Sequence, residues 1–253
     1  MSPWDKILEM PGPQDHLVQF YGQHEGSLIE RVGRYLWEGL RQGDRVLAIA
    51  TPAHIAHFQE QIRKLGGDPA SAVRSRTLAF LDARETLNRF MINDHPDWWR
   101  FQTTIAEAIR QMKNKGDRPL RAYGEMVDLL WKDGRYWAAT RLEHFWDTLL
   151  ALYPLTLFCA YQIDPFNKDL RAEALGEILR AHTHVIPNTS DPELETRLTQ
   201  AIDEVLGSER PPASYQTNGP VMSHGESLLL WLRSKMPEYA DRIVDRVRQT
   251  VEA

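Results

Sequence analysis

The sequence contains a single cysteine, Cys159, and no apolar run that approaches the roughly 20 residues needed to cross a bilayer. One cysteine excludes an internal disulfide and is typical of a reducing compartment, so a cytoplasmic location is expected. The chain does not open with basic residues followed by an apolar core, and a secretory signal is therefore not indicated. The net charge of −5 gives no attraction to nucleic acid or to an anionic membrane surface.

Recognisable catalytic motifs are missing as well. The sequence has no Gly-x-Ser-x-Gly, no His-Glu-x-x-His and no Cys-x-x-Cys. Two histidine pairs, His54 with His57 and His182 with His184, lack the cysteine or carboxylate companions of a zinc signature. Cys159 has no basic neighbour in the sequence and is interpreted as a buried, inert thiol. We therefore expect a non-catalytic protein with no metal and no cofactor.

The chain does contain the opening of a βαβ unit over residues 16–50. A short apolar strand at 17–21 precedes a loop, a helix at 27–41 follows, and a continuous apolar run at 46–50 is typical of a buried parallel strand. This order is that of a P-loop nucleotide-binding fold, but the loop has no Gly-Lys-Ser/Thr and offers His24 and Glu25 instead. The sequence thus predicts a P-loop scaffold that has lost its phosphate-binding chemistry.

Strands and helices continue to alternate as far as residue 166. Further strands are expected at 77–81, 120–123 and 155–161, with helices between them. This rhythm predicts an α/β fold with a mostly parallel sheet and helices on both faces. Residues 1–15 are expected to form an irregular arm, and residues 191–253 a helical extension with a flexible connector at 208–220.

Several segments resemble the MEDS family, a sensory domain named for methanogen and methylotroph proteins and for a dichloromethane-responsive regulator. The segments include His16-Leu-Val-Gln-Phe-Tyr21, Tyr123-Gly-Glu-Met-Val-Asp-Leu-Leu-Trp131 and Leu157-Phe-Cys-Ala-Tyr161. The resemblance covers about residues 16–190. It implies a relative of the RecA and KaiC ATPases without a working Walker loop. It also implies a role in sensing a small molecule, proposed to be a hydrocarbon derivative, for an output module such as a histidine kinase or a DNA-binding domain. This chain shows neither kinase motifs nor a helix-turn-helix.

Ligands of open α/β sheets bind outside the carboxyl ends of the strands. The expected strand ends therefore supply the candidate ligand-binding residues, which are Tyr21, His24, Thr51, Asp82, Glu125 and Tyr161. The amino end of the helix that begins near Ser27 would also favour a carboxylate, so an organic acid is a second ligand class.

Structural alternatives stay open for three of these residues. Glu125 could instead cap the following helix or pair with Arg121 or Arg141. Asp82 is well placed to be a helix N-cap, and His24 could simply cap its loop.

Three functions follow from these patterns. The favoured one is a sensor that binds a small molecule and relays its occupancy through the C-terminal helices to a partner, such as a histidine kinase or transcription regulator. A residual nucleotide-binding protein or weak ATPase would need Glu125 with a divalent ion, and the missing lysine argues against it. The third is a structural module that forms a homodimer. Direct binding to nucleic acid or to a membrane is not expected.

Overall fold

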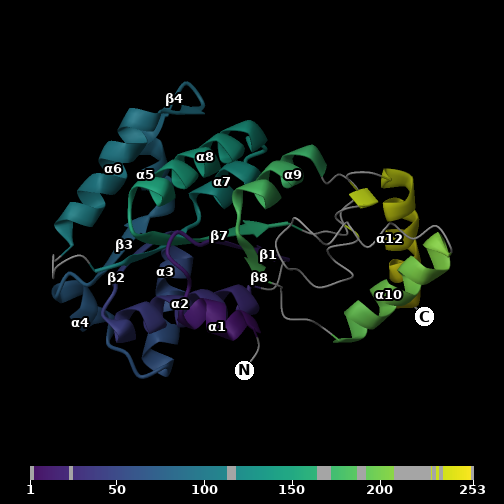
Figure 1. Ribbon diagram of the computed structural model, residues 1–253, viewed down its shortest axis with the longest axis horizontal. Coiled ribbons are helices and arrows are strands. Elements are labelled where there is room, and N and C mark those ends of the chain that lie inside the picture. The colour runs from purple at the N-terminus through teal and green to yellow at the C-terminus, as the bar shows by residue number, and fades with distance from the viewer. Residues whose placement is uncertain are drawn as a thin grey trace.

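The structure is a computed structural model that describes residues 3–22, 25–112, 118–163, 172–186, 192–207, 229, 232–233 and 236–251. Its main feature is a six-stranded parallel sheet with the strand order β3-β2-β6-β7-β1-β8 (Figure 1). The strands are β1 (His16–Tyr21), β2 (Arg45–Ala50), β3 (Leu78–Asp82), β6 (Leu120–Gly124), β7 (Leu155–Gln162) and β8 (His184–Ile186). A small antiparallel pair joins β4 (Met91–Ile92) to β5 (His95–Pro96).

Helices cover both faces of this sheet. They are α1 (Pro3–Glu9), α2 (Gly26–Gln42), α3 (Pro52–Lys64), α4 (Pro69–Arg74), α5 (Ala83–Phe90), α6 (Trp98–Gln111), α7 (Met126–Lys132), α8 (Tyr136–Leu152) and α9 (Ala172–Ala181). The predicted α/β fold, with a parallel sheet between two helical layers, is confirmed.

The direction of the chain through the sheet decides which helix covers which face. The chain moves from β1 to β2 and β3 in one direction, and returns through β6 and β7 to β8 in the other. Because parallel crossovers are right-handed, the helices of the two directions must lie on opposite faces. Figure 1 shows α1 to α4 below the sheet and α5 to α9 above it. Each face has its own apolar core, and alternate residues of β7 point into one or the other.

Local chemistry sets the boundaries of these elements. Gly43 ends α2 in the left-handed conformation, with φ of 80°, as the predicted turn requires. Thr51 and Asp82 act as N-caps: the side chain of each accepts a hydrogen bond from the backbone N–H three residues later. These caps start α3 and α5 directly at the carboxyl ends of β2 and β3.

Residues 1–15 are expected to form an irregular arm, but this expectation is wrong for Pro3–Glu9, which form the helix α1. Leu8 is buried against the core below the sheet. Arg34 of α2 pairs with Asp5 at 2.7 Å and with Glu9 at 2.5 Å. The Arg121 guanidinium donates to the carbonyl oxygens of Leu8, at 3.1 Å, and Glu9, at 2.9 Å. These tertiary contacts stabilise a helix that is too short for sequence periodicity to reveal.

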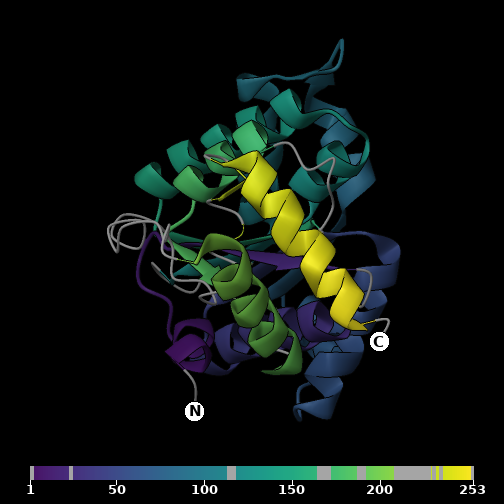
Figure 2. The ribbon, with the colours of Figure 1, turned by 90° about the vertical axis from the view of Figure 1, so that its right-hand side faces the viewer.

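The C-terminal helices α10 (Pro192–Leu206) and α12 (Pro237–Val251) pack against each other. Among the described residues they form a separate apolar core, which includes Leu198, Ile202, Ile243 and Val244. Figures 1 and 2 place this pair at the end of the molecule toward which the arrowhead of β7 points, which is the carboxyl end of the sheet. The predicted connector at 208–220 lies outside the described residues.

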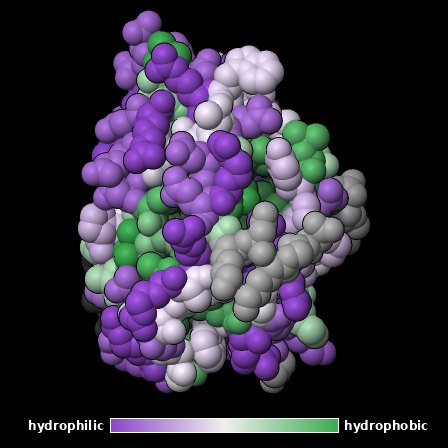
Figure 3. Space-filling model, turned by 90° about the vertical axis from the view of Figure 1, so that its left-hand side faces the viewer, coloured by the Kyte–Doolittle hydropathy of each residue, from purple (hydrophilic) through white to green (hydrophobic). Residues whose placement is uncertain are grey.

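Figure 3 shows the end of the molecule opposite the α10–α12 pair. Hydrophilic residues cover most of it, and hydrophobic residues form small separate areas.

In the part of the chain that the structure describes, no helix has the length and apolarity that a membrane span requires.

Replacing Arg121 by methionine should lower the free energy of unfolding by about 3 kcal/mol, measured by urea denaturation. The guanidinium is buried and pairs with Asp44 at 2.7 Å, so its removal leaves a largely buried carboxylate without compensation. Arg63→Met is the matched control, since Arg63 and Glu60 form a pair that is exposed on both sides and its loss should barely change the unfolding midpoint. Equal losses in the two variants would contradict this account of α1 docking.

Candidate functional site

The carboxyl ends of neighbouring strands carry loops that leave in opposite directions. The chain leaves β2 for α3 on one face, whereas it leaves the adjacent β6 for α7 on the other face. The same divergence occurs between β1 and β7, whose chains continue to α2 and α9. Such switch points are where open α/β sheets bind ligands. A polar network occupies each of the two.

The first network centres on Glu125, which is buried and directly precedes α7. Its carboxylate accepts a hydrogen bond from the backbone N–H of Thr51 at 2.8 Å and lies 3.3 Å from the Thr51 hydroxyl. His54 bonds the other carboxylate oxygen through Nδ1 at 2.9 Å, and its Nε2 lies 3.2 Å from a Glu25 oxygen. Burial opposes the charged imidazole, but the hydrogen bonds and charges of Glu125 and Glu25 outweigh it and raise the pKa of His54.

The second network joins β1, β7 and α7 through Asp128, which is fully buried. Tyr21 donates its hydroxyl proton to Asp128 at 2.7 Å, and the backbone N–H of Gln162 donates to the other carboxylate oxygen at 2.7 Å. Lys132 lies 2.8 Å from Asp128 and donates to the Tyr21 hydroxyl at 3.1 Å. Burial nevertheless raises the pKa of Asp128, although Lys132 and the Gln162 N–H act to lower it.

The structure thus brings together some of the candidate residues and separates others. Thr51 and Glu125 are in direct contact, and Tyr21 lies in the neighbouring network. Asp82 accepts from the Glu85 N–H at 2.8 Å as the cap of α5. Tyr161 donates its hydroxyl proton to Glu143 above the sheet, away from Thr51 and Glu125. The remaining candidate, His24, lies outside the described residues.

The alternative partners weighed for Glu125 are not the ones it has. Arg121 pairs with Asp44, the Arg141 guanidinium lies over the Trp137 and Phe145 rings, and the side chain of Glu125 makes no capping hydrogen bond to α7. Its charged partner is His54, which comes one helical turn after the end of β2.

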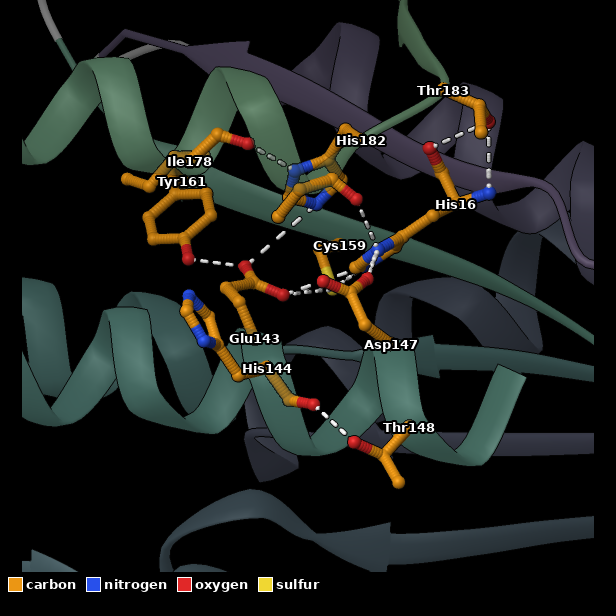
Figure 4. A network of polar contacts seen from close by, with 11 residues as sticks. His16, Glu143, His144, Asp147, Thr148, Cys159, Tyr161, Ile178, His182 and Thr183 are labelled. Carbon is orange, nitrogen blue, oxygen red and sulfur yellow. Dashed lines mark hydrogen bonds and ion pairs between the residues drawn. The ribbon is translucent and has the colours of Figure 1, made fainter. Parts of the chain in front are cut away.

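A further polar cluster lies beneath α8 and α9 and consists of His16, Glu143, Cys159 and His182, all of them buried (Figure 4). His16 Nε2 is 3.4 Å from Glu143 Oε2 and 3.5 Å from Cys159 Sγ. Cys159 Sγ is 3.8 Å from the same carboxylate oxygen, and His182 Nε2 is 3.7 Å from Glu143 Oε1. Two imidazoles, a thiol and a carboxylate form the type of ligand set that holds a transition-metal ion.

The backbone fixes the orientation of both imidazoles in this cluster. His182 Nδ1 lies 2.6 Å from the carbonyl oxygen of Ile178, and His16 Nδ1 lies 2.9 Å from that of Ala181 and 3.0 Å from Asp147 Oδ1. A carbonyl oxygen can only accept, so each Nδ1 carries a proton and each Nε2 points to the interior of the cluster.

Charges within the cluster move the pKa values of the two rings apart. Burial opposes protonation of His16, but its contacts with Asp147 and Glu143 outweigh it and raise the pKa of His16 to about 9. Burial and the neighbouring His16 charge lower the pKa of His182 to about 3. His182 is therefore the neutral ring of the pair at ordinary pH.

Sequence reasoning missed His54, Asp128 and Lys132 at the strand ends. His54 and Asp128 each lie three residues after a candidate, Thr51 and Glu125 respectively, so adding the first helical turn to each strand end would have found them. The cluster of His16, Glu143, Cys159 and His182 could not be assembled in this way. Its members come from two strands, a helix and the connection between α9 and β8. The pairing of β1 with β7 and the packing of α8 against β7 and α9 bring them together.

A parallel sheet with helices on both faces, and with polar side chains at the carboxyl ends of its strands, defines an open α/β domain. The family model described as "MEthanogen/methylotroph, DcmR Sensory domain" (MEDS) matches residues 15–183. The chain therefore belongs to the MEDS family of sensory domains.

Among solved structures, the flagellar accessory protein FlaH from Methanocaldococcus jannaschii is similar at 15% identity and a TM-score of 0.47. The similarity covers 73% of this chain and 76% of that one. A comparison with curated proteins gives no match.

Replacing His54 by glutamine should destabilise the protein by about 1–3 kcal/mol at pH near 6 and by less near pH 9. The raised pKa of His54 means that the folded protein holds this proton more tightly than the unfolded chain. The resulting stabilisation is complete below the unfolded pKa of about 6.5 and is lost as pH rises through the higher folded value.

The measurement is urea denaturation of wild type and variant across this pH range. His16 titrates in both proteins, so the difference between them isolates His54. His57→Gln, an exposed change on the same helix, is the matched control and should leave the free energy of unfolding nearly unchanged. If the difference in free energy of unfolding between wild type and His54→Gln grows toward pH 9, the raised pKa of His54 is refuted.

Proposed function

We propose that this chain is a sensor that binds a small hydrocarbon derivative at the carboxyl ends of β1, β2, β6 and β7 and relays its occupancy to a partner protein. Its membership of a sensory domain family supports this role. The observation that carries the proposal is the Glu125 network, in which a buried carboxylate at one strand end holds the hydrogen-bond donors of the neighbouring strand end. A ligand that offers donors to Glu125 would compete with Thr51 and His54 and would shift the position of α3.

The charges at the strand ends favour certain ligands over others. Three carboxylates, from Glu25, Glu125 and Asp128, face His54 and Lys132. This balance gives no net positive charge for a triphosphate, which agrees with the missing Walker lysine. A hydroxylated or amino-bearing hydrocarbon derivative matches the acceptors better than an organic acid does, while Lys132 remains the group on which an acid would bind.

The helix pair α10–α12 supports the relay. It has its own apolar core and lies at the carboxyl end of the sheet, beside the proposed binding region (Figures 1 and 2). A ligand that favours one arrangement of the strand-end loops would bias the position of this pair only through unequal affinity for the two arrangements. The partner we propose is a signalling protein such as a histidine kinase or a transcription regulator.

A thermal-shift screen with small alcohols, amines, organic acids and other hydrocarbon derivatives tests the proposal. A ligand present at 100 times its dissociation constant should stabilise the protein by about 2.7 kcal/mol. Glu125→Gln should weaken its binding by about 10- to 100-fold, because the ligand loses a hydrogen bond to a charged group.

Asp97→Asn is the control, since Asp97 caps α6 by accepting from the Arg100 N–H and asparagine serves equally well as an N-cap. This variant should bind like the wild type. ATP with Mg²⁺ should cause no shift. Stabilisation by ATP together with phosphate release, or a ligand that Glu125→Gln binds unchanged, would overturn the proposal.

A further inference from the structure

We propose that His16, Glu143, Cys159 and His182 form a binding site for a divalent transition-metal ion, with Zn²⁺ as the ion that suits them best. One potential ligand atom from each residue lies within 4.8 Å of all the others. All four residues are buried, so the ion would be closed off from solvent on the side of the sheet covered by α8 and α9. This site is separate from the strand-end networks, and its test is independent of theirs.

The spacing of three of the four ligand atoms matches tetrahedral coordination, and the fourth, from His182, lies within 4.8 Å of the others. Metal–ligand bonds of 2.0–2.3 Å place neighbouring ligand atoms of a tetrahedral zinc site about 3.3–3.7 Å apart. The separations in the cluster are 3.4 Å for His16 Nε2 and Glu143 Oε2, 3.5 Å for His16 Nε2 and Cys159 Sγ, and 3.8 Å for Cys159 Sγ and Glu143 Oε2. Shifts of a few tenths of an ångström would thus bring these three atoms onto one ion.

His182 supplies the independent evidence that the cluster is built for a ligand. Its Nδ1 proton goes to the Ile178 carbonyl, and its Nε2 lone pair points to the other three residues. Among the described residues, this buried nitrogen has no hydrogen-bond partner. A buried nitrogen without a partner costs free energy, and a metal ion would give it one.

The surroundings of the four residues are those of a metal centre. Histidine ligands of metals usually donate their second N–H to a carbonyl or carboxylate, which fixes the ring and makes it more basic. His182 makes this bond to Ile178, and His16 makes it to Ala181 and Asp147. Tyr161 donates to Glu143 Oε1 and leaves Oε2 to face His16 and Cys159.

A competing interpretation is a catalytic cysteine. Cys159 contacts His16 Nε2, and His16 Nδ1 contacts Asp147, which is the order of contacts in a Cys-His-Asp triad. Such a nucleophile must reach its substrate and must be a thiolate. Cys159 has no exposed surface, and burial together with the Glu143 charge raises the pKa of its thiol well above the usual value. A metal ion needs neither an exposed thiol nor a free thiolate, because it displaces the thiol proton when it binds.

The ion would connect parts of the chain that lie far apart in sequence. His16 begins β1, Cys159 lies within β7, Glu143 belongs to α8, and His182 stands between α9 and β8. Thr183 adds a direct link, since its backbone N–H and its hydroxyl both donate to the His16 carbonyl. Binding would therefore fix α9 and β8 to the centre of the sheet.

Metal content and cobalt spectroscopy of the full chain test the proposal. Protein purified without chelator and dialysed against Zn²⁺ should contain about one equivalent by mass spectrometry. Substitution with Co²⁺ should give a thiolate-to-cobalt charge-transfer band and the intense visible bands of tetrahedral coordination. Cys159→Ser should abolish the charge-transfer band, and His182→Gln should lower metal content at least tenfold after the same dialysis.

His144→Gln is the matched control, because His144 lies on the exposed side of α8, next to Glu143, and should leave both readouts unchanged. Circular dichroism establishes that each variant is folded. If His182→Gln does not fold, the wild-type cobalt spectrum decides alone. A wild type that binds no metal, or His182→Gln and His144→Gln that bind it equally, would refute the site. Rapid alkylation of Cys159 in the native protein would favour the nucleophile instead.

Discussion

Right-handed crossovers between parallel strands are the constraint on which the three polar regions of this protein depend. The chain runs outward along the sheet on one face and returns on the other, so neighbouring strands release their loops in opposite directions at β2/β6 and β1/β7. The side chains that follow these strands can then meet across the gap, as Thr51 and Glu125 do. The return path also places α8 and α9 over β1 and β7, which encloses His16 and Cys159.

Buried ionisable groups are tolerated here because each is compensated by named partners. Glu125 has Thr51 and His54, Asp128 has Tyr21, Lys132 and the Gln162 amide, and Glu143 has His16 and Tyr161. Such networks are costly when a member is lost, because the interior screens charge weakly. A strong dependence of stability on each hydrogen bond suits a sensor, because a small change in hydrogen bonding at a strand end alters the stability of the loop and helix that follow the strand. The metal site we propose would supply the partner that the His182 ring lacks.

Much of the fold could be predicted from the sequence because its signals are local. Apolar runs such as 46–50, the Gly43 turn and the Thr51 and Asp82 caps act over a few residues. The helix α1 and the three-residue strand β8 were not predicted, because partners distant in sequence stabilise them. The strand ends could be read from the sequence, but the partners of Glu125 and the cluster around His16 follow from sheet order and side-chain direction. Sheet order and side-chain direction cannot be read from any single segment of the sequence.

Because α10 and α12 have a separate core, this helix pair and the sheet are expected to differ in their free energy of local unfolding. Among the described residues this core is not continuous with the cores of the sheet, and a unit packed in this way can open by itself, at a free energy below that of global unfolding. Amide hydrogens of this helix pair are therefore expected to exchange with solvent sooner than those of β7, which is hydrogen-bonded on both sides. Exchange kinetics would thus report the docking of the pair residue by residue, and would do so without any knowledge of what the protein binds.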